Sequence, residues 1–170
     1  GRREGGVGGR LVRRGGASRR EGACDWSSGW VQRSAQFIAG AWRVASDMAG
    51  ARQDGSASPE ASSGNDALRR HTRRLLADAP SLVEAYKFNV VVARLMEQVN
   101  VTRKAIDGAT GATDPAVHES AEAIAMILSL FAPYTAEDMW AMLGHEPTVA
   151  LAVWPEADPA LLVEDEIKLV

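Results

Sequence analysis

Residues 82–106 read LVEAYKFNVVVARLMEQVNVTRKAI, and this stretch decides the fold class. From residue 88 to residue 99, apolar side chains recur at intervals of three and four, which places them on one face of a helix. The residues on that face are Phe88, Val91, Val92, Leu95, Met96 and Val99. The spacing predicts an amphipathic helix that begins near residue 82 or residue 88 and ends near Ile106.

The same helical period appears on both sides of this stretch. It predicts helices over residues 28–49, 65–79, 115–132 and 135–143. Several amphipathic helices with short connections favour an all-α fold, a helical bundle of four to five helices. The predicted core is Phe37, Trp42, Leu75, Val92, Leu95, Val99, Ile124, Leu128, Phe131 and Trp140.

Glycine and proline residues predict where these helices end. We expect Gly50 to end the first helix and Pro80 to break or kink the second, because proline removes a donor and clashes with the preceding turn. Asp114 followed by Pro115 is typical of a helix start. Residues 149–153 alternate like a short extended strand.

Three parts of the chain differ in composition. Residues 1–24 are rich in Gly and Arg and are expected to be disordered. Residues 25–147 hold the helical bundle. Residues 148–170 are expected to be an extended segment that leads into a truncated C-terminal domain.

Composition excludes some classes of protein. The chain has 170 residues, of which 46% are hydrophobic, and no run of 18 apolar residues that would cross a membrane. One cysteine cannot form an internal disulfide, which fits a reducing cytoplasm. The net charge is -3, but residues 105–170 carry one lysine against twelve carboxylates. An anionic partner would therefore meet the N-terminal side of the molecule.

No catalytic motif is present. The sequence lacks a P-loop, a G-x-G-x-x-G turn, H-E-x-x-H and G-x-S-x-G, and its histidines have no metal-ligand spacing. We expect no catalytic residue, no cofactor and no metal in this chain.

Basic residues gather in the second predicted helix. Arg69 and Arg73 lie one turn apart, as do Arg70 and Arg74, so that four guanidinium groups cover adjoining faces. A phosphate backbone would relieve their repulsion. Alternatively, the arginines pair with Asp66, Asp78 or the acidic C-terminal half of the chain. The predicted tRNA-phosphate contacts are Arg69, Arg70, Arg73, Arg74, Lys87 and Arg94.

Several ordered motifs resemble one enzyme family. Residues 85–100, AYKFNVVVARLMEQVN, are similar to the "KFN…A…LME..N" helix of leucyl-tRNA synthetases. The stretch 130–140, LFAPYTAEDMW, resembles that family's "LAPFAPH.AEE.W" pattern, and LGHE at 143–146 and VWPEAD at 153–158 follow in family order. Upstream, FIAGAWR at 37–43 is similar to its "F..R.WR" helix, although Gly40 stands where the family tends to place a basic residue.

The resemblance implies the helical anticodon-binding domain that follows the catalytic core of a class I aminoacyl-tRNA synthetase. In the leucyl branch this domain is thought to grip the body of the tRNA. The parent enzyme joins leucine to its tRNA with ATP and Mg²⁺, and its HIGH and KMSKS signatures are absent here. The implied partners are leucine-specific tRNA and the missing catalytic domain, and we expect a cytoplasmic monomer.

Three alternatives remain open at this point. The same domain occurs in valyl, isoleucyl and methionyl relatives, although the "KFN…LME" and "WPEAD" stretches favour the leucyl branch. The chain could also be a stand-alone helical interaction module that uses its acidic C-terminal face. A third alternative is a fragment without a function of its own.

Overall fold

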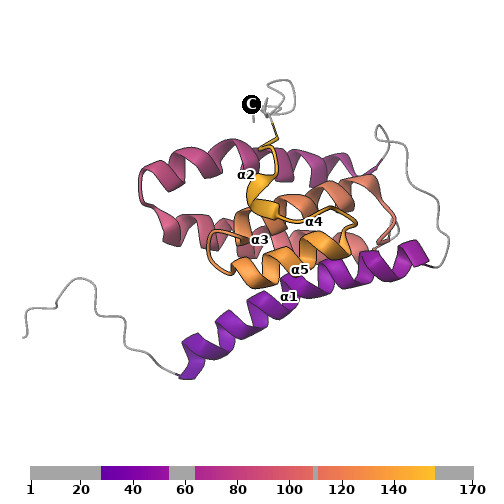
Figure 1. The fold of residues 1–170 in the computed structure, drawn as a ribbon, viewed down its shortest axis with the longest axis horizontal. Coiled ribbons are helices and arrows are strands. Elements are labelled where there is room, and N and C mark those ends of the chain that lie inside the picture. Colours follow the sequence, from indigo (N-terminus) through magenta and orange to yellow (C-terminus); the bar gives the residue numbers. More distant parts are fainter. Residues whose placement is uncertain (1–27, 54–63, 109–110, 156–170) are drawn as a thin grey trace, which may run out of the picture.

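The computed structural model describes residues 28–53, 64–108 and 111–155 (Figure 1). These ranges form five α-helices and one short 3-10 helix, and no strand occurs within them. The elements are α1 (Ser28–Gln53), α2 (Asp66–Glu84), α3 (Phe88–Ile106), α4 (Pro115–Leu128), α5 (Pro133–Met142) and η1 (Val149–Leu151). The predicted all-α bundle is confirmed. The predicted segment 1–24 and residues 156–170 lie outside the described residues.

Helix α4 is the centre of the bundle. It packs against α1, α2, α3 and α5, and it is the most completely buried of the helices. Its alanines let neighbouring helices approach closely, while its larger residues, Ile124, Ile127 and Leu128, fill the space between them. Helices α2 and α3 form an antiparallel hairpin, and α1 crosses the bundle as the longest element (Figure 1).

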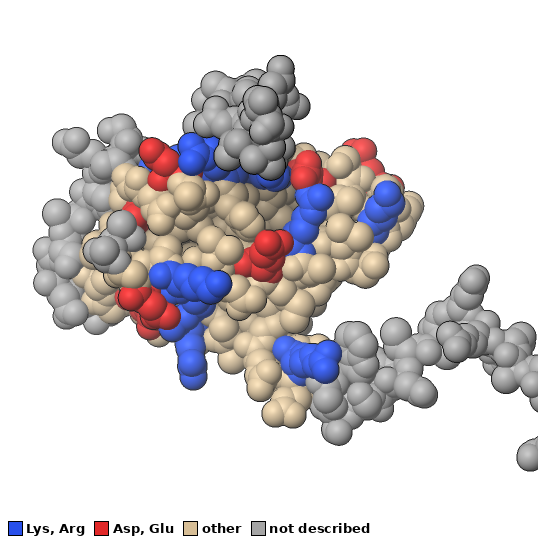
Figure 2. All heavy atoms as spheres, turned by 180° about the vertical axis from the view of Figure 1, so that it is seen from behind, with Lys and Arg blue, Asp and Glu red and all other residues tan. Residues whose placement is uncertain are grey.

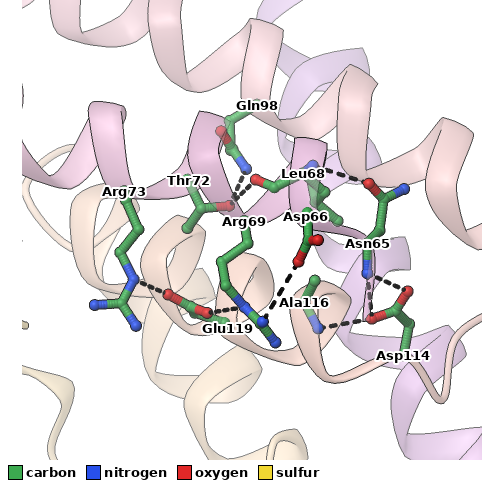
Figure 3. Close-up of polar contacts among 10 residues, drawn as sticks. All are labelled: Asn65, Asp66, Leu68, Arg69, Thr72, Arg73, Gln98, Asp114, Ala116 and Glu119. Carbon is green, nitrogen blue, oxygen red and sulfur yellow. Dashed lines mark hydrogen bonds and ion pairs between the residues drawn. The ribbon is translucent and has the colours of Figure 1, made fainter. Parts of the chain in front are cut away.

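One carboxylate holds the starts of two helices. The Asp114 side chain caps α4 by accepting the amide of Ala116 at 2.8 Å, and it also accepts the amide of Asn65 at 3.1 Å (Figure 3). Asn65 in turn caps α2 by accepting the amide of Leu68 at 3.0 Å. Gly64 has a φ of +138°, and a Cβ there would overlap the Asp114 carboxylate. The N-termini of α2 and α4 are therefore fixed to each other.

A polar network lies inside the apolar core. The Gln98 side chain of α3 donates to the hydroxyls of Thr72 at 2.8 Å and Ser120 at 2.6 Å, which joins three helices. Its carbonyl contacts His71 Nδ1 at 2.5 Å, and Thr102 lies 2.6 Å from the Ser120 hydroxyl. Among the described residues, every buried side-chain nitrogen and oxygen has a partner. Such a network favours one arrangement of the helices over others.

The predicted break at Pro80 is wrong. Helix α2 continues through Pro80 to Glu84, and Pro80 is exposed on its outer side. Proline leaves the carbonyl of Leu76, four residues earlier, without a helical donor. That carbonyl instead accepts a hydrogen bond from the Trp154 indole nitrogen at 3.2 Å. The predicted stop at Gly50 is also wrong, since α1 runs on to Gln53.

The turn between α2 and α3 places a tyrosine in a left-handed conformation. Tyr86 has a φ of +56°. The amide of Lys87 donates to the carbonyl of Leu82 at 2.9 Å, and the amide of Tyr86 donates to that of Val83 at 3.0 Å. These are the two bonds of a Schellman motif, in which glycine is usual. A left-handed tyrosine costs about 1–2 kcal/mol.

The expected strand at 149–153 does not form. Val149–Leu151 make a 3-10 turn instead, and the Glu137 carboxylate accepts the Val149 amide at 3.1 Å. No strand among the described residues is available to pair with this segment. A local capping bond therefore satisfies the backbone where a sheet ladder cannot.

Most of the predicted core is buried, but two aromatic residues are not. Trp42 is 39% exposed and Phe131 is 37% exposed. Trp42 lies on the apolar stripe of α1, whereas Phe131 lies in the turn that follows α4, because α4 ends at Leu128 and not at residue 132. Phe37 and Val92 are partly buried, and the remaining predicted core residues are buried: Leu75, Leu95, Val99, Ile124, Leu128 and Trp140.

Candidate nucleic-acid interface

The four arginines of α2 divide into two pairs. Arg69 and Arg73 lie on the face that packs against α4, where both bind the carboxylate of Glu119 (Figure 3). Arg69 Nε is 3.3 Å from Glu119 Oε2, and the Arg69 side chain is only 13% exposed. Arg69 also lies 3.9 Å from Asp66. This pair joins α2 to α4 rather than facing a ligand.

Arg70 and Arg74 form the second pair. Arg70 comes one residue after Arg69, and Arg74 one residue after Arg73, so each is rotated by about 100° around the helix axis. This rotation turns both side chains away from α4 toward solvent, and both are exposed. Arg70 makes no hydrogen bond or ion pair with any described residue. Figure 2 shows Lys and Arg side chains along the upper edge of the molecule, which α2 occupies, with carboxylates at intervals. We call Arg70 and Arg74 the exposed arginine pair.

The other two predicted contacts do not join this pair. Arg94 binds Asp78 in an ion pair that links α3 to α2. Lys87 is exposed in the α2–α3 turn. Fourteen residues separate Arg70 from the end of α2 at Glu84, which is about 21 Å along the helix. The six predicted residues therefore do not form one continuous patch.

The alternative that the arginines pair with carboxylates describes part of the cluster. From the sequence, Asp66, Asp78 and the acidic C-terminal half were the alternative partners of the arginines. In the structure, Asp66, Asp78 and Glu119 form these ion pairs. The choice of Glu119 depends on how α4 packs against α2, which no local pattern reveals.

A second charged cluster lies where the first half of α4 contacts the end of α5 and the residues that follow it. His145 stacks on the Trp140 ring, with centroids 4.0 Å apart, and its Nε2 lies 2.6 Å from Glu122. His118 Nδ1 is 3.3 Å from the same carboxylate. Burial raises the pKa of Glu122, but hydrogen bonds and charge from His118 and His145 outweigh it and lower the pKa below its ordinary 4.5.

The described residues show no sign of a metal or membrane site. They contain no group of three or more His, Cys, Asp or Glu side chains arranged to hold a metal ion. In the same ranges, no helix combines the length and the apolar character needed to span a bilayer.

Comparison with known proteins identifies the bundle. A family model described as the anticodon-binding domain of tRNA ligase matches residues 65–170. A leucine–tRNA ligase of Leifsonia xyli subsp. xyli is 55% identical over 86% of this chain and 16% of its own length. One from Arthrobacter sp. is 54% identical over 91% of this chain and 18% of its own. The chain thus spans about one sixth of the length of these relatives.

A solved structure has the same fold. The chain superposes on LeuRS in the ternary complex of Agrobacterium radiobacter K84 LeuRS, tRNA and LeuAMS with a TM-score of 0.67 and 21% identity. The match covers 82% of this chain and 18% of that one. The relatives favour the leucyl branch over the valyl, isoleucyl and methionyl alternatives. Because the family model matches well over half of its residues, this chain belongs to the anticodon-binding domains of tRNA ligases.

Proposed function

We propose that this chain is the tRNA-binding helical domain of a leucine–tRNA ligase and that it positions leucine-specific tRNA for ATP-dependent leucylation. The family match and the leucine–tRNA ligase relatives support this parentage. In this proposal, ATP and Mg²⁺ bind to the catalytic domain of the parent enzyme. The described helices hold and orient the RNA, and the enzyme acts as a cytoplasmic monomer.

The exposed arginine pair carries the proposal. A guanidinium group that is already bound to a partly buried carboxylate gains little from a phosphate, because it must first give up that partner. Arg69 and Arg73 are in this position. Arg70 and Arg74 are chosen for their exposure and spacing: both are exposed one turn apart on the next face of α2, and two guanidinium groups at this spacing can contact neighbouring phosphates of one strand.

Lys87 and Arg94 remain predicted contacts of a different kind. Lys87 is exposed at the far end of α2 and could meet a separate part of the RNA. Arg94 would have to share its charge with Asp78. We therefore place both below the exposed arginine pair in their contribution to binding.

The test is binding of a leucine-specific tRNA transcript to the whole 170-residue chain, measured by fluorescence anisotropy. Arg70→Gln/Arg74→Gln should weaken binding by about tenfold at moderate salt, since each lost phosphate contact removes a favourable charge interaction. Arg43→Gln/Lys104→Gln is the matched control, because it removes the same charge from two other exposed positions on α1 and α3. Equal losses in the two variants would mean that binding depends on net charge and not on the exposed arginine pair.

A further inference from the structure

Five large apolar side chains are exposed together at one end of the bundle. They come from the turn between α2 and α3 and from the turn between α4 and α5, which lie at the same end, on the left in Figure 1. Tyr86 is 83% exposed and Tyr134 is 88% exposed. We call this surface the aromatic end: it consists of Tyr86, Phe88, Leu130, Phe131 and Tyr134.

Ring contacts link three residues of the aromatic end to one another. The rings of Tyr86 and Phe88 meet edge to face with centroids 6.0 Å apart, and Phe88 meets Phe131 in the same way at 6.2 Å. Phe88 therefore connects the two turns. Single exposed apolar residues are ordinary on protein surfaces, whereas a contiguous patch marks a binding surface.

The chemistry of the aromatic end fits a protein partner better than RNA. Residues 85–91 carry a single charge, on Lys87, and residues 128–136 carry none. Depletion of charge together with enrichment in aromatic residues is typical of the centre of a protein interface. A phosphate backbone instead needs several cations in a row, and these lie elsewhere, on α2.

The area of the patch fits contact between domains of one chain. At about 200 Å² per aromatic residue, the exposed parts of the four rings present on the order of 500 Å². Interfaces between domains of one chain bury about 600–1,500 Å² in total, which is about half of that on each side. The aromatic end is therefore large enough to serve as one side of such an interface.

The relatives favour a partner within the same chain. They are leucine–tRNA ligases in which more than four-fifths of the chain lies outside the matching segment. Helix α1 begins at the same end of the bundle as the two turns (Figure 1), so a domain joined to its N-terminus would be held beside the aromatic end. Because such a domain belongs to the same chain, its effective concentration at the bundle is high, and a modest interface then suffices.

We propose that the aromatic end is the surface on which the part of the leucine–tRNA ligase chain preceding α1 packs. This inference rests on the proposed parentage but not on the exposed arginine pair. The turn itself supports it, because a tyrosine occupies the left-handed position where glycine would be less strained, and its ring points into solvent.

Nitration with tetranitromethane tests the proposal, because Tyr86 and Tyr134 are the only two tyrosines of this chain. A chimera carries this chain in place of the matching segment of the Leifsonia xyli enzyme, and peptide mass spectrometry follows both rings. Nitration should be about tenfold slower in the chimera than in the isolated chain, since a millimolar effective concentration keeps a 0.1 mM interface closed about nine-tenths of the time. Equal rates in the two proteins would overturn the proposal.

Two further nitration experiments test RNA and a second copy of the chain as alternative partners. Protection of the isolated chain by leucine-specific tRNA would assign the aromatic end to RNA, and protection that grows with protein concentration would assign it to a second copy; either result overturns the proposal. If the chimera does not fold, the isolated chain is mixed with a Leifsonia xyli enzyme lacking the matching segment at about 1 mM, the concentration that the tether would supply, and unchanged nitration counts against the proposal. The nitration result does not affect the tRNA affinities measured for the Arg70 and Arg74 variants. Either proposal can therefore be contradicted without the other.

Discussion

Trp154 donates a hydrogen bond to the carbonyl of Leu76, the group that Pro80 leaves without a helical donor. The distance is 3.2 Å, and the two residues are 78 positions apart in the sequence. The segment after η1 thus compensates a local defect of α2. This contact explains how α2 can contain a proline and still continue for another turn.

We predict that Trp154→Phe lowers the free energy of unfolding by about 1–2 kcal/mol, because the Leu76 carbonyl loses its donor. In a Pro80→Ala background the same substitution should cost less than about 0.5 kcal/mol, since the amide of residue 80 can then donate to that carbonyl. Urea unfolding of the four proteins measures the coupling. Equal costs in the two backgrounds would show that Trp154 acts through packing alone.

The carboxylate shared by two helix starts gives a second prediction. Gly64→Ala should destabilise the bundle by about 2–3 kcal/mol, because its Cβ would displace Asp114 and the backbone has a positive φ. Gly50→Ala is the control: it lies inside α1 with open space around it and should stabilise the bundle by about 0.5–1 kcal/mol. Thermal unfolding shifts of the same sign in both variants would contradict this account of Gly64.

The ion pairs of Arg69 and Arg73 with Glu119 give a third prediction. Glu119→Gln leaves two partly buried guanidinium groups without their shared carboxylate and should cost about 1–3 kcal/mol of unfolding free energy. Glu97→Gln, at an exposed carboxylate 3.8 Å from His71, should change it by less than about 0.5 kcal/mol. Chemical denaturation distinguishes the two, and a small effect at Glu119 would mean that its arginines are available to RNA after all.

Acid should lower the free energy of unfolding through Glu122, which links α4 to His145 after the end of α5. The pKa of Glu122 is lower in the folded state than its ordinary 4.5, so its ionised form contributes stability that is present above that value. This contribution is lost as the pH falls below about 4.5 and through the folded pKa. Glu122→Gln should therefore flatten the dependence of unfolding free energy on pH in this acidic window. An unchanged slope would contradict the assignment to Glu122.

Local patterns predicted the helices well because apolar spacing and caps are properties of neighbouring residues. The start of α4 at Asp114–Pro115 and the burial of Val91, Leu95 and Val99 on α3 are examples. Phe88, predicted on the same inward face, is instead exposed, because it lies at the first position of α3 beside the turn. Pro80 and the segment at Val149 were predicted wrongly because their outcome depends on distant groups, Trp154 and Glu137. A rule based on local propensity does not take account of a hydrogen-bond donor that lies 78 residues away in the sequence.

The candidate site was predictable only in part for the same reason. The sequence places four arginines on adjoining faces of one helix, but it does not show which face α4 covers. Glu119 decides this, by binding Arg69 and Arg73 and leaving the next face of α2 exposed. The resemblance to leucyl-tRNA synthetases indicated the parentage, whereas the division of the arginines required the three-dimensional arrangement.

The central claim is that α2 has one structural pair of arginines and one pair that meets RNA. The most direct measurement is the slope of log affinity for leucine-specific tRNA against log salt concentration. Arg70→Gln/Arg74→Gln should reduce this slope by about 1.8, which is about 0.9 for each lost phosphate contact in the duplex limit. An unchanged slope in that variant, or an equal reduction in a folded Arg69→Gln/Arg73→Gln variant, would contradict the account.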